Sequence, residues 1–300
     1  SSQVKAYYEI TALEGLRNHL GDEVEVTFAA GYTVAPEAEA DPALIREATS
    51  AAAAADAVVL VGGLIHGYTD EWEDNAYDAE FLDKPDMMLP FGQDALIQAV
   101  LAANPSTVIV LQSGGPVDMR AWEPEAKAII QAWYGGMEGG NALAAVLFGD
   151  VNPSGKLPMT FPMKLEDSPA HALSSYPDEN LLIDHTEGLV VGYRYLDSYD
   201  GKPAFAFGHG LSYTSFEYSD LSVTQGDEGV EVGLRITNNG SVQGAEVVQV
   251  YVRDEESSLP RPAKELKAFD KVDLPAGESI DLTFVLGDEA FSYYDPEHAG

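Results

Sequence analysis

The sequence predicts an α/β domain with a doubly wound, mostly parallel sheet, followed by an all-β sandwich. Up to about residue 165, helical and strand patterns alternate, as a sheet with crossover helices requires. The strand segments in this part are unbroken apolar runs, which is typical of strands that are buried on both faces. From about Phe216 the pattern changes to two-residue alternation interrupted by turn signals, which favours an antiparallel sandwich. We therefore expect an α/β domain over residues 1–165, a connector over residues 166–215 and a β-sandwich over residues 216–300.

The elements of the α/β domain are predicted from periodic apolar segments that end at glycine, asparagine or proline. Gly21 ends the first helix, and the pair Gly62 and Gly63 follows the apolar strand Ala57–Val61. The predicted helices span residues 13–20, 42–56, 94–103 and 141–148. The predicted strands span residues 24–28, 57–61, 107–111 and 128–133.

The sandwich is predicted from strands with alternating apolar and polar residues. They span residues 230–237, 245–252, 271–274 and 280–285, with a short edge strand at Phe291–Tyr294. Such a set is one strand short of a complete sandwich. We therefore expect the sandwich to be truncated and the α/β domain to be incomplete at its start, so that the chain is part of a longer protein.

The composition excludes several classes of function. The 300 residues contain 16 Lys and Arg against 50 Asp and Glu, a formal net charge of −34. This charge repels nucleic-acid backbones and anionic lipid surfaces, so neither is an expected partner. The absence of Cys excludes disulfides and Cys-ligated metal sites. The acidity fits a saline habitat or ordinary acidic solubility equally well, and the compartment stays open.

The first place to search for a ligand site is the segment after the strand at 57–61, because ligands of parallel sheets bind beyond the carboxyl ends of the strands. Residues 64–90 form a long polar loop segment that contains both aromatic and carboxylate side chains. Aromatic faces and carboxylates suit a sugar ring and its hydroxyl groups. The alternatives are a solvated acidic loop and, less favoured because no Gly occupies the sharp turn, a calcium loop. We expect no bound metal and no cofactor.

Four stretches of sequence occur in an order that is specific to one family. The strongest is FAFGHGLSYT at Phe205–Thr214, and the others lie at Gly149–Pro158, Glu187–Tyr195 and Pro262–Phe269. Together they resemble glycoside hydrolase family 3, the β-glucosidase family. The resemblance implies an α/β sandwich domain followed by a fibronectin type III-like domain. Within the four stretches, Gly208, Gly210, Tyr213, Tyr193, Arg194 and Lys156 are expected to have structural rather than sugar-binding roles.

The resemblance also implies a separate (β/α)8 barrel, in which members carry the nucleophilic aspartate, usually in a Ser-Asp-Trp stretch. No such stretch occurs in this sequence. We therefore expect this chain to supply the general acid/base loop of a retaining, exo-acting β-glucosidase, and the barrel to supply the nucleophile. The implied partners are the barrel and a β-glucoside or cello-oligosaccharide, and a homo-oligomer stays open.

The resemblance places the general acid/base at Glu80. Family members carry a Glu in a frame E-G-x-D-R-K before Leu-Pro, and this chain has Glu80, Asp83 and Lys84 before Leu89 and Pro90. Phe81 stands where the family has Gly, so Glu71 and Glu73 compete for the role. Three nearby aromatic residues are the candidate substrate-binding side chains: Trp72, Tyr77 and Phe81. The alternative functions are a noncatalytic binding or scaffold portion and a β-xylosidase or exoglucanase of the same family.

Overall fold

The computed structural model describes residues 6–35, 38–64, 86–174 and 183–294. The chain divides into two compact units. The first contains residues 1–148 with 163–165, and the second contains residues 149–162 with 166–300. None of the helices in the described part of the chain combines the length and the apolar character needed to cross a bilayer.

The first unit is built on a parallel sheet of three strands. β1 (Val58–Gly63), β2 (Thr107–Gln112) and β3 (Ala128–Gln131) lie in the order β1-β2-β3, and both pairs are parallel. Ile109, in the central strand, pairs with Leu60 on one side and Ile129 on the other, and its side chain is fully buried. The unbroken β-branched runs of the sequence thus form strands that are covered on both faces.

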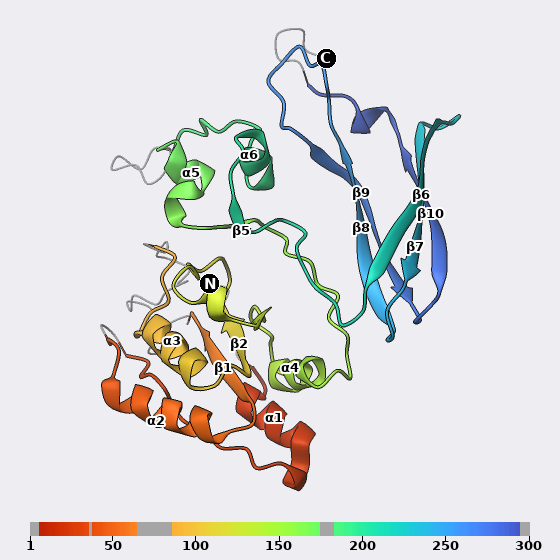
Figure 1. The fold of residues 1–300 in the computed structure, drawn as a ribbon. Helices are drawn as coiled ribbons and strands as arrows, with labels where there is room; N and C mark the ends of the chain where they lie inside the picture. Colours follow the sequence, from red (N-terminus) through yellow and green to blue (C-terminus); the bar gives the residue numbers. More distant parts are fainter. Residues whose placement is uncertain (1–5, 36–37, 65–85, 175–182, 295–300) are drawn as a thin grey trace. The chain divides into compact units, whose positions relative to one another are not determined.

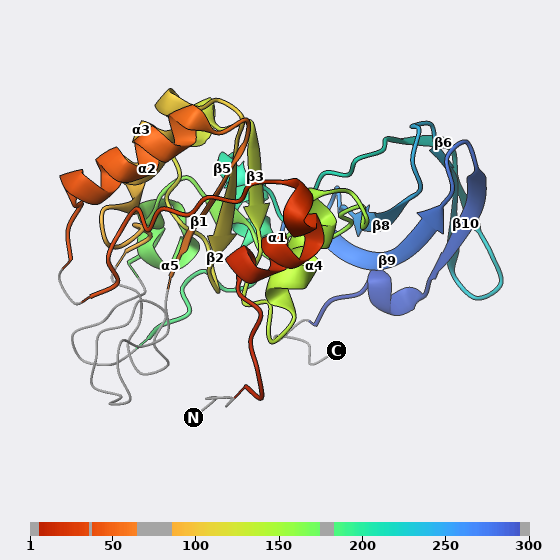
Figure 2. The ribbon, with the colours of Figure 1, turned by 90° about the horizontal axis from the view of Figure 1, so that it is seen from below.

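Two pairs of helices cover this sheet, and Figures 1 and 2 show the pairs on opposite sides of the strands. One pair is α1 (Ala12–Leu20) with α4 (Gly139–Leu147), and the other is α2 (Pro42–Ala54) with α3 (Gln93–Ala103). Helix α1 begins at a capping box, in which Thr11 and Glu14 bond each other's backbone N–H groups. Short 3-10 helices occur at Gly21–Glu23 and Glu123–Glu125. The parallel sheet with helices on both faces confirms the predicted α/β class.

The second unit begins at residue 149 and contains the connector predicted at residues 166–215. Here β4 (Phe161–Pro162) pairs antiparallel with β5 (Pro203–Phe205). A 3-10 helix at Leu165–Asp167 and the short helices α5 (Pro169–Ala172) and α6 (Tyr193–Ser198) lie between these strands in the sequence. The described part of the connector therefore contains small elements that the sequence pattern did not indicate.

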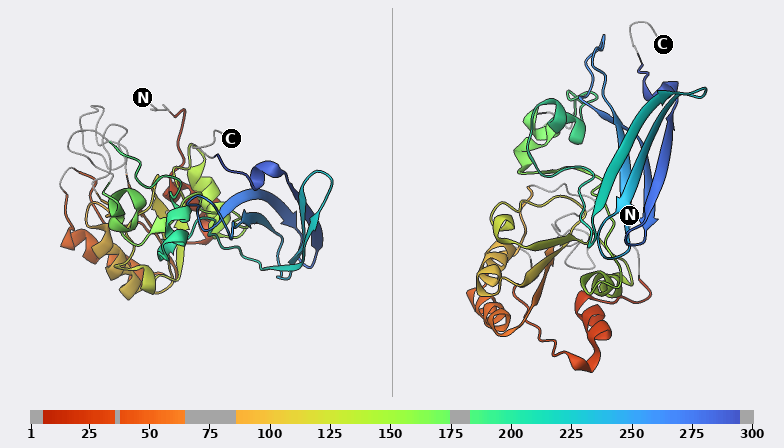
Figure 3. Two further views of the ribbon diagram at one scale, coloured as in Figure 1. Left: turned by 90° about the horizontal axis from the view of Figure 1, so that it is seen from above. Right: turned by 45° about the vertical axis from the view of Figure 1, so that its right-hand side comes forward.

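The rest of the second unit is a sandwich of two antiparallel sheets (Figures 1 and 3). One sheet has the order β10-β7-β6, formed by Ser279–Leu286, Val230–Asn238 and Phe216–Gln225. The other pairs β8 (Gly244–Val252) with β9 (Glu265–Leu274). Ile236 of β7 and Val248 of β8 are buried between the sheets. The sandwich class is therefore confirmed.

Two predicted strands are wrong. Residues 24–28 have no strand pairing, and Val24 and Phe28 are 48% and 66% exposed. Their β-branched sequence favours extended backbone, but a strand also needs a neighbour to accept its ladder bonds. Residues 291–294 follow a 3-10 helix at Asp288–Ala290, and the N–H groups of Phe291 and Ser292 bond the Asp288 carbonyl instead of another strand.

Candidate active site

The predicted site residues lie in the segment that leaves the carboxyl end of β1. Glu80, its competitors Glu71 and Glu73, and the aromatic residues Trp72, Tyr77 and Phe81 all lie outside the described residues. The structure describes the two stems of this segment, which are Leu64 on one side and the residues from Asp86 onward on the other. These stems and the sheet edge beside them determine where the segment is attached to the first unit.

The outgoing stem is held by the side chain of Gln93. The Gly63 N–H donates to Gln93 Oε1 at 2.8 Å, and Gln93 Nε2 donates to the Gly63 carbonyl at 2.8 Å. The next N–H, that of Leu64, donates to the Gln112 carbonyl of β2 at 2.8 Å. Gln93 is only 1% exposed, so this two-sided amide bond is shielded from water. The direction in which the chain leaves β1 is therefore fixed.

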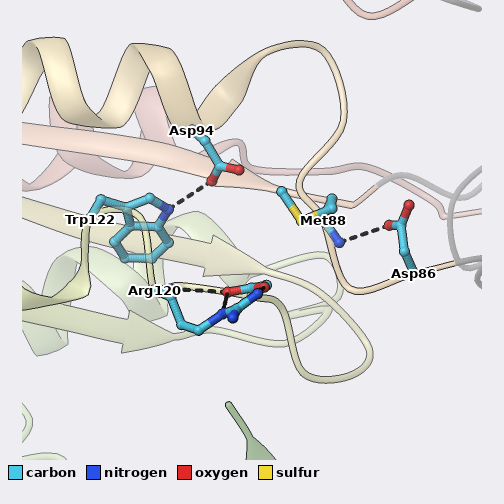
Figure 4. A network of polar contacts seen from close by, with 6 residues as sticks. Asp86, Met88, Asp94, Arg120 and Trp122 are labelled. Atoms are coloured by element: carbon cyan, nitrogen blue, oxygen red, sulfur yellow. Dashed lines mark hydrogen bonds and ion pairs between the residues drawn. The ribbon is translucent and has the colours of Figure 1, made fainter. Parts of the chain in front are cut away.

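The returning stem is anchored by apolar side chains and one backbone bond. Met87, Leu89 and Phe91 are all buried, between 5% and 6% exposed. The Met87 carbonyl accepts a hydrogen bond from the Asp118 N–H at 2.7 Å. Asp86 accepts from the Met88 N–H at 2.8 Å, a contact that Figure 4 shows at the start of the stem. Both ends of the segment are thus attached to the core of the first unit.

Two carboxylates with opposite pKa shifts, Asp94 and Asp118, lie beside the returning stem, and Figure 4 shows Asp94 with its partner Trp122. Asp94, in the first turn of α3, accepts from the indole N–H of the fully buried Trp122 at 2.8 Å. Burial raises the pKa of Asp94, the Trp122 hydrogen bond opposes this shift, and the charge of Asp118 adds to it. Hydrogen bonds from Arg120, whose Nε lies 2.9 Å from Asp118 Oδ1, lower the pKa of Asp118 despite its burial.

These two carboxylates were not singled out from the sequence. An Asp near a helix start is commonly a helix-capping residue, so the position of Asp94 in the sequence did not indicate a buried acid. The bond to Trp122 joins residues 28 positions apart, and only the fold brings them together. Their chemistry is that of a polar network that supports the stem. A carboxylate held by Arg120 is a poor proton donor near neutral pH.

The ends of β2 and β3 carry a second buried polar pair. Gln131 Nε2 donates to the Ser113 carbonyl at 2.9 Å and lies 3.0 Å from Ser113 Oγ. Gln131 Oε1 is buried and has no hydrogen-bond donor among the described residues. Within the same part of the chain, no three His, Asp or Glu side chains converge in a way that could hold a metal ion.

The residues of the four family-like stretches form a web of contacts within the second unit. Asn152 Oδ1 accepts from Ser212 Oγ at 2.9 Å and from the Tyr213 N–H at 2.8 Å. Lys156 Nζ donates to the Gly210 carbonyl at 2.9 Å and pairs with Glu246 at 3.0 Å. The stretches at Gly149–Pro158 and Phe205–Thr214 are thereby tied to each other and to β8.

The other two stretches meet in the same way. Glu265 of β9 pairs with Arg194 at 3.4 Å and with Arg261, and the Leu266 N–H donates to the Tyr193 hydroxyl at 2.9 Å. A cavity of about 60 Å³ lies beside Tyr193, Phe207 and Tyr251. This volume is well below the roughly 300 to 1,000 Å³ of a typical ligand pocket. Tyr193, Arg194 and Lys156 thus make structural contacts.

Comparison with known proteins gives two family matches. The model described as the glycosyl hydrolase family 3 C-terminal domain matches residues 1–213. The model described as the fibronectin type III-like domain matches residues 246–300. The sequence resemblance is therefore confirmed.

Individual relatives agree with these matches. The chain is 42% identical to the thermostable β-glucosidase B of Acetivibrio thermocellus over 95% of its own length and 36% of that protein. It is 39% identical to a β-glucosidase of Bacteroides ovatus, over 98% of this chain and 40% of that protein.

Solved structures extend the agreement to the fold. A family 3 β-glucosidase of Bifidobacterium adolescentis superposes with a TM-score of 0.90 at 38% identity, over 99% of this chain and 42% of that one. A β-glucosidase of Kluyveromyces marxianus in complex with glucose superposes with a TM-score of 0.78 at 42% identity. The match covers 88% of this chain and 30% of that one. The chain thus spans between 30% and 42% of the length of these relatives. Because the family model covers residues 1–213, well over half of the chain, the protein belongs to glycosyl hydrolase family 3.

Proposed function

We propose that this chain is the portion of a retaining, exo-acting β-glucosidase that carries the general acid/base, and that it acts on terminal β-D-glucosyl residues. The observation that carries the proposal is the 42% identity to a β-glucosidase over 288 residues. The glucose bound to the similar Kluyveromyces marxianus enzyme supports glucose as the sugar. The proposed substrate is a β-glucoside or a cello-oligosaccharide.

The chemistry needs two carboxyl groups in opposite roles. In a retaining glycosidase one carboxylate attacks the anomeric carbon while the other carboxylic acid protonates the departing oxygen, and the two lie about 5 to 5.5 Å apart. We assign the acid to Glu80 of this chain and the nucleophile to the barrel domain. The attack forms a glycosyl–enzyme ester and releases the alcohol. Glu80 then removes a proton from water, which attacks the ester and releases glucose with its configuration retained.

The fixed stems of the segment support this role for the chain. A proton donor must be placed within hydrogen-bond reach of the glycosidic oxygen, so the segment that carries it needs a rigid base. Gln93 on one side and Met87 on the other supply such a base. An acid also needs a raised pKa to keep its proton near neutral pH. Neighbouring carboxylates and apolar aromatic rings both raise the pKa of a carboxylic acid, and the sequence of residues 64–90 contains both.

The experiment that tests the proposal compares substrates with good and poor leaving groups in the barrel-containing enzyme. Glu80→Gln is expected to lower kcat/KM for methyl β-glucoside by about 10² to 10⁴. It should have a much smaller effect on a nitrophenyl β-glucoside, whose leaving group needs no proton. Proton NMR of the first product formed by the parent enzyme should show the β-anomer.

Glu71→Gln and Glu73→Gln are the matched controls, since each removes one carboxylate from the same acidic segment. One of these two variants, rather than Glu80→Gln, could lower kcat/KM for methyl β-glucoside far more than for the nitrophenyl β-glucoside. In that case the residue it replaces is the acid. Equal losses on both substrates for all three variants contradict an acid role for this segment. A parent enzyme that binds glucosides without cleaving them supports the noncatalytic alternative. A preference for xylosides would reassign the protein to the β-xylosidase alternative.

A further inference from the structure

Both units of the chain carry a large excess of carboxylates. The first unit has 7 Lys and Arg against 23 Asp and Glu, and the second has 9 against 27. Their formal net charges are therefore −16 and −18, so the charge is divided almost equally between two folded bodies. Without residues 65–85, the first unit still has 6 Lys and Arg against 16 Asp and Glu. No single acidic segment accounts for the excess.

Several of the positive charges of the second unit lie in partly buried ion pairs. Arg194, Arg261 and Lys267 all pair with the carboxylate of Glu265. The side chains of these three cations are between 12% and 32% exposed. Three of the nine cations in this unit thus neutralise one carboxylate, which leaves the exposed carboxylates with fewer partners.

Exposed carboxylates follow one another directly at the surface of both units. Among the described residues, such runs include Asp22–Glu23, Asp227–Glu228, Asp254–Glu256 and Asp288–Glu289. In dilute buffer these neighbours repel one another, because the Debye length is about 10 Å at 0.1 M salt. At 1 M salt it falls to about 3 Å, and most of the repulsion is screened. Molar salt therefore removes a force that opposes the compact state.

Ordinary solubility does not need charges of this size. A net charge of about 2 to 8 in magnitude keeps a small domain soluble. Each unit has at least twice that charge, and a net charge far from zero destabilises the compact state through self-repulsion. The division of the charge between both units therefore favours a saline environment over ordinary acidic solubility, a choice that the composition alone leaves open.

We propose that the fold of this protein depends on molar salt, which screens the repulsion between its exposed carboxylates, and that both units lose most of their stability in dilute buffer. The effect is collective, since one exposed substitution changes only one of many charges. In molar salt the exposed charges are screened, and the loss of a partly buried partner, as in the pair of Lys156 and Glu246, still lowers stability. The salt dependence is a property of the fold and is independent of the proposed β-glucosidase function.

Urea unfolding of the 300-residue chain at low and high salt tests the proposal. All three Trp residues lie in the first unit, so their fluorescence follows that unit, and far-UV circular dichroism follows both units. In about 1 M KCl, we expect the urea midpoint to be roughly twice its value in about 0.1 M KCl. Equal midpoints at the two salt concentrations would overturn the proposal.

Two triple variants of the first unit separate charge screening from other effects of salt. The first variant neutralises three exposed carboxylates, by Asp22→Asn, Glu23→Gln and Glu25→Gln. The second neutralises three exposed cations, by Arg17→Gln, Arg46→Gln and Lys127→Gln. The two variants change the net charge of the unit by the same amount in opposite directions. In dilute buffer the first should raise the urea midpoint and the second should lower it, and in about 1 M KCl both should agree with the parent within error.

The remaining outcomes contradict the proposal. If KCl raises the midpoints of the parent and both variants equally, salt acts on apolar burial rather than on charge. If the carboxylate variant is less stable than the parent in dilute buffer, repulsion between these side chains does not limit the stability of the unit. Either result would mean that the acidic surface serves solubility alone.

Discussion

The parallel-sheet unit and the sandwich unit both bond their backbones with buried neutral amides, but the described part of the sandwich unit adds a set of partly buried ion pairs. In the first unit, buried neutral amides bond the main chain. Gln93 bonds Gly63, and Asn104 Nδ2 donates to the carbonyls of Ala52 and Ala55 at 2.9 and 2.8 Å. In the second unit, the buried Asn238 likewise donates through Nδ2 to the carbonyls of Val242 and Leu274, at 2.9 Å each, and charged side chains add to these amide bonds. Glu265 forms ion pairs with Arg194, Arg261 and Lys267. Lys156 forms an ion pair with Glu246 and donates a hydrogen bond to the Gly210 carbonyl.

The four stretches that carry the sequence resemblance lie in the second unit, whereas the family model also matches the whole of residues 1–148, where the acid/base is expected. Two of these stretches contain charged residues with partly buried partners, since Lys156 pairs with Glu246 and Glu265 pairs with Arg194 and Arg261. We therefore expect the first unit to be sensitive to side-chain shape and the second to charge, and single substitutions in each unit can test this contrast.

The largest effect is expected at Gly140, where α4 touches the backbone before α1. A Cβ on Gly140 would lie 2.0 Å from the Thr11 carbonyl oxygen and 2.6 Å from that of Ile10. Backbone atoms cannot move away as a flexible side chain can, so Gly140→Val should lower the free energy of unfolding of this unit by about 3 kcal/mol. Urea denaturation followed by the fluorescence of the buried Trp122 measures the change.

Gly139→Ala is the matched control for this variant. Gly139 is the preceding residue of the same helix, and a Cβ there meets nothing within 4 Å. This control should be neutral or slightly stabilising, because Ala has the higher helix propensity. Equal destabilisation by both variants would contradict the close approach of the two backbones.

The second largest effect is expected at Gln93. Gln93→Leu keeps the volume but removes both hydrogen bonds to Gly63, and it leaves a buried N–H and a buried carbonyl with lost partners. Losses of this kind cost about 2 to 3 kcal/mol in the free energy of unfolding. Gln98→Leu, on the exposed side of the same helix, should cost less than about 1 kcal/mol. If the two variants lose equal stability in urea, the buried amide is not what holds the outgoing stem.

Much of the fold could be predicted from the sequence because apolar runs report burial directly. The strands at β1 and β2 and the helices at α1 and α3 lie within a residue or two of their predicted bounds. Residues 24–28 and 291–294 were predicted wrongly, because propensity describes a single segment and a strand needs a partner. The early end of β3 could not be foreseen either, since the sequence shows glycines at 135 and 136 but not the turn at Trp133.

Less of the candidate site could be predicted. The segment after β1 was identified from topology, but Glu80 and its competitors lie outside the described residues, so their roles stay predictions. Gln93 and Asp94 are ordinary polar residues at a helix start in the sequence. Their contacts reach Gly63 and Trp122, about 30 positions away in each case, and only the fold reveals them. Conversely, the structural roles expected for Lys156 and Arg194 agree with their ion pairs.

A smaller effect, of about 1 kcal/mol or less, is expected from the two carboxylates beside the stem, and its sign depends on pH. The folded-state pKa of Asp94 is raised, so its contribution to the free energy of unfolding falls as pH rises from the ordinary Asp range through the raised value. The pKa of Asp118 is lowered, so its contribution is present above the ordinary range and is lost as pH falls. Asp94→Asn should therefore stabilise the unit near neutral pH, and Asp118→Asn should destabilise it.

Urea unfolding of both variants across the acidic range, from about pH 3 to pH 7, tests these signs. The difference between Asp94→Asn and the parent should shrink towards low pH, where Asp94 is protonated in both the folded and the unfolded chain. The difference for Asp118→Asn should shrink in the same direction. Parallel curves for parent and variants would mean that neither carboxylate changes its pKa on folding.

The smallest effect on stability is expected at an exposed ion pair of the sandwich. This pair shows where the sensitivity of the second unit to charge ends. Arg235 pairs with Asp281 at 2.7 Å, but the two side chains are 46% and 70% exposed, so water and salt screen the attraction. Arg235→Gln should leave the urea midpoint unchanged within error. Lys156→Gln should lower it measurably, because Lys156 and Glu246 are only 17% and 14% exposed and Glu246 would lose its buried partner. Charge therefore matters in the sandwich unit only where it is buried, and equal effects of the two substitutions would refute that distinction.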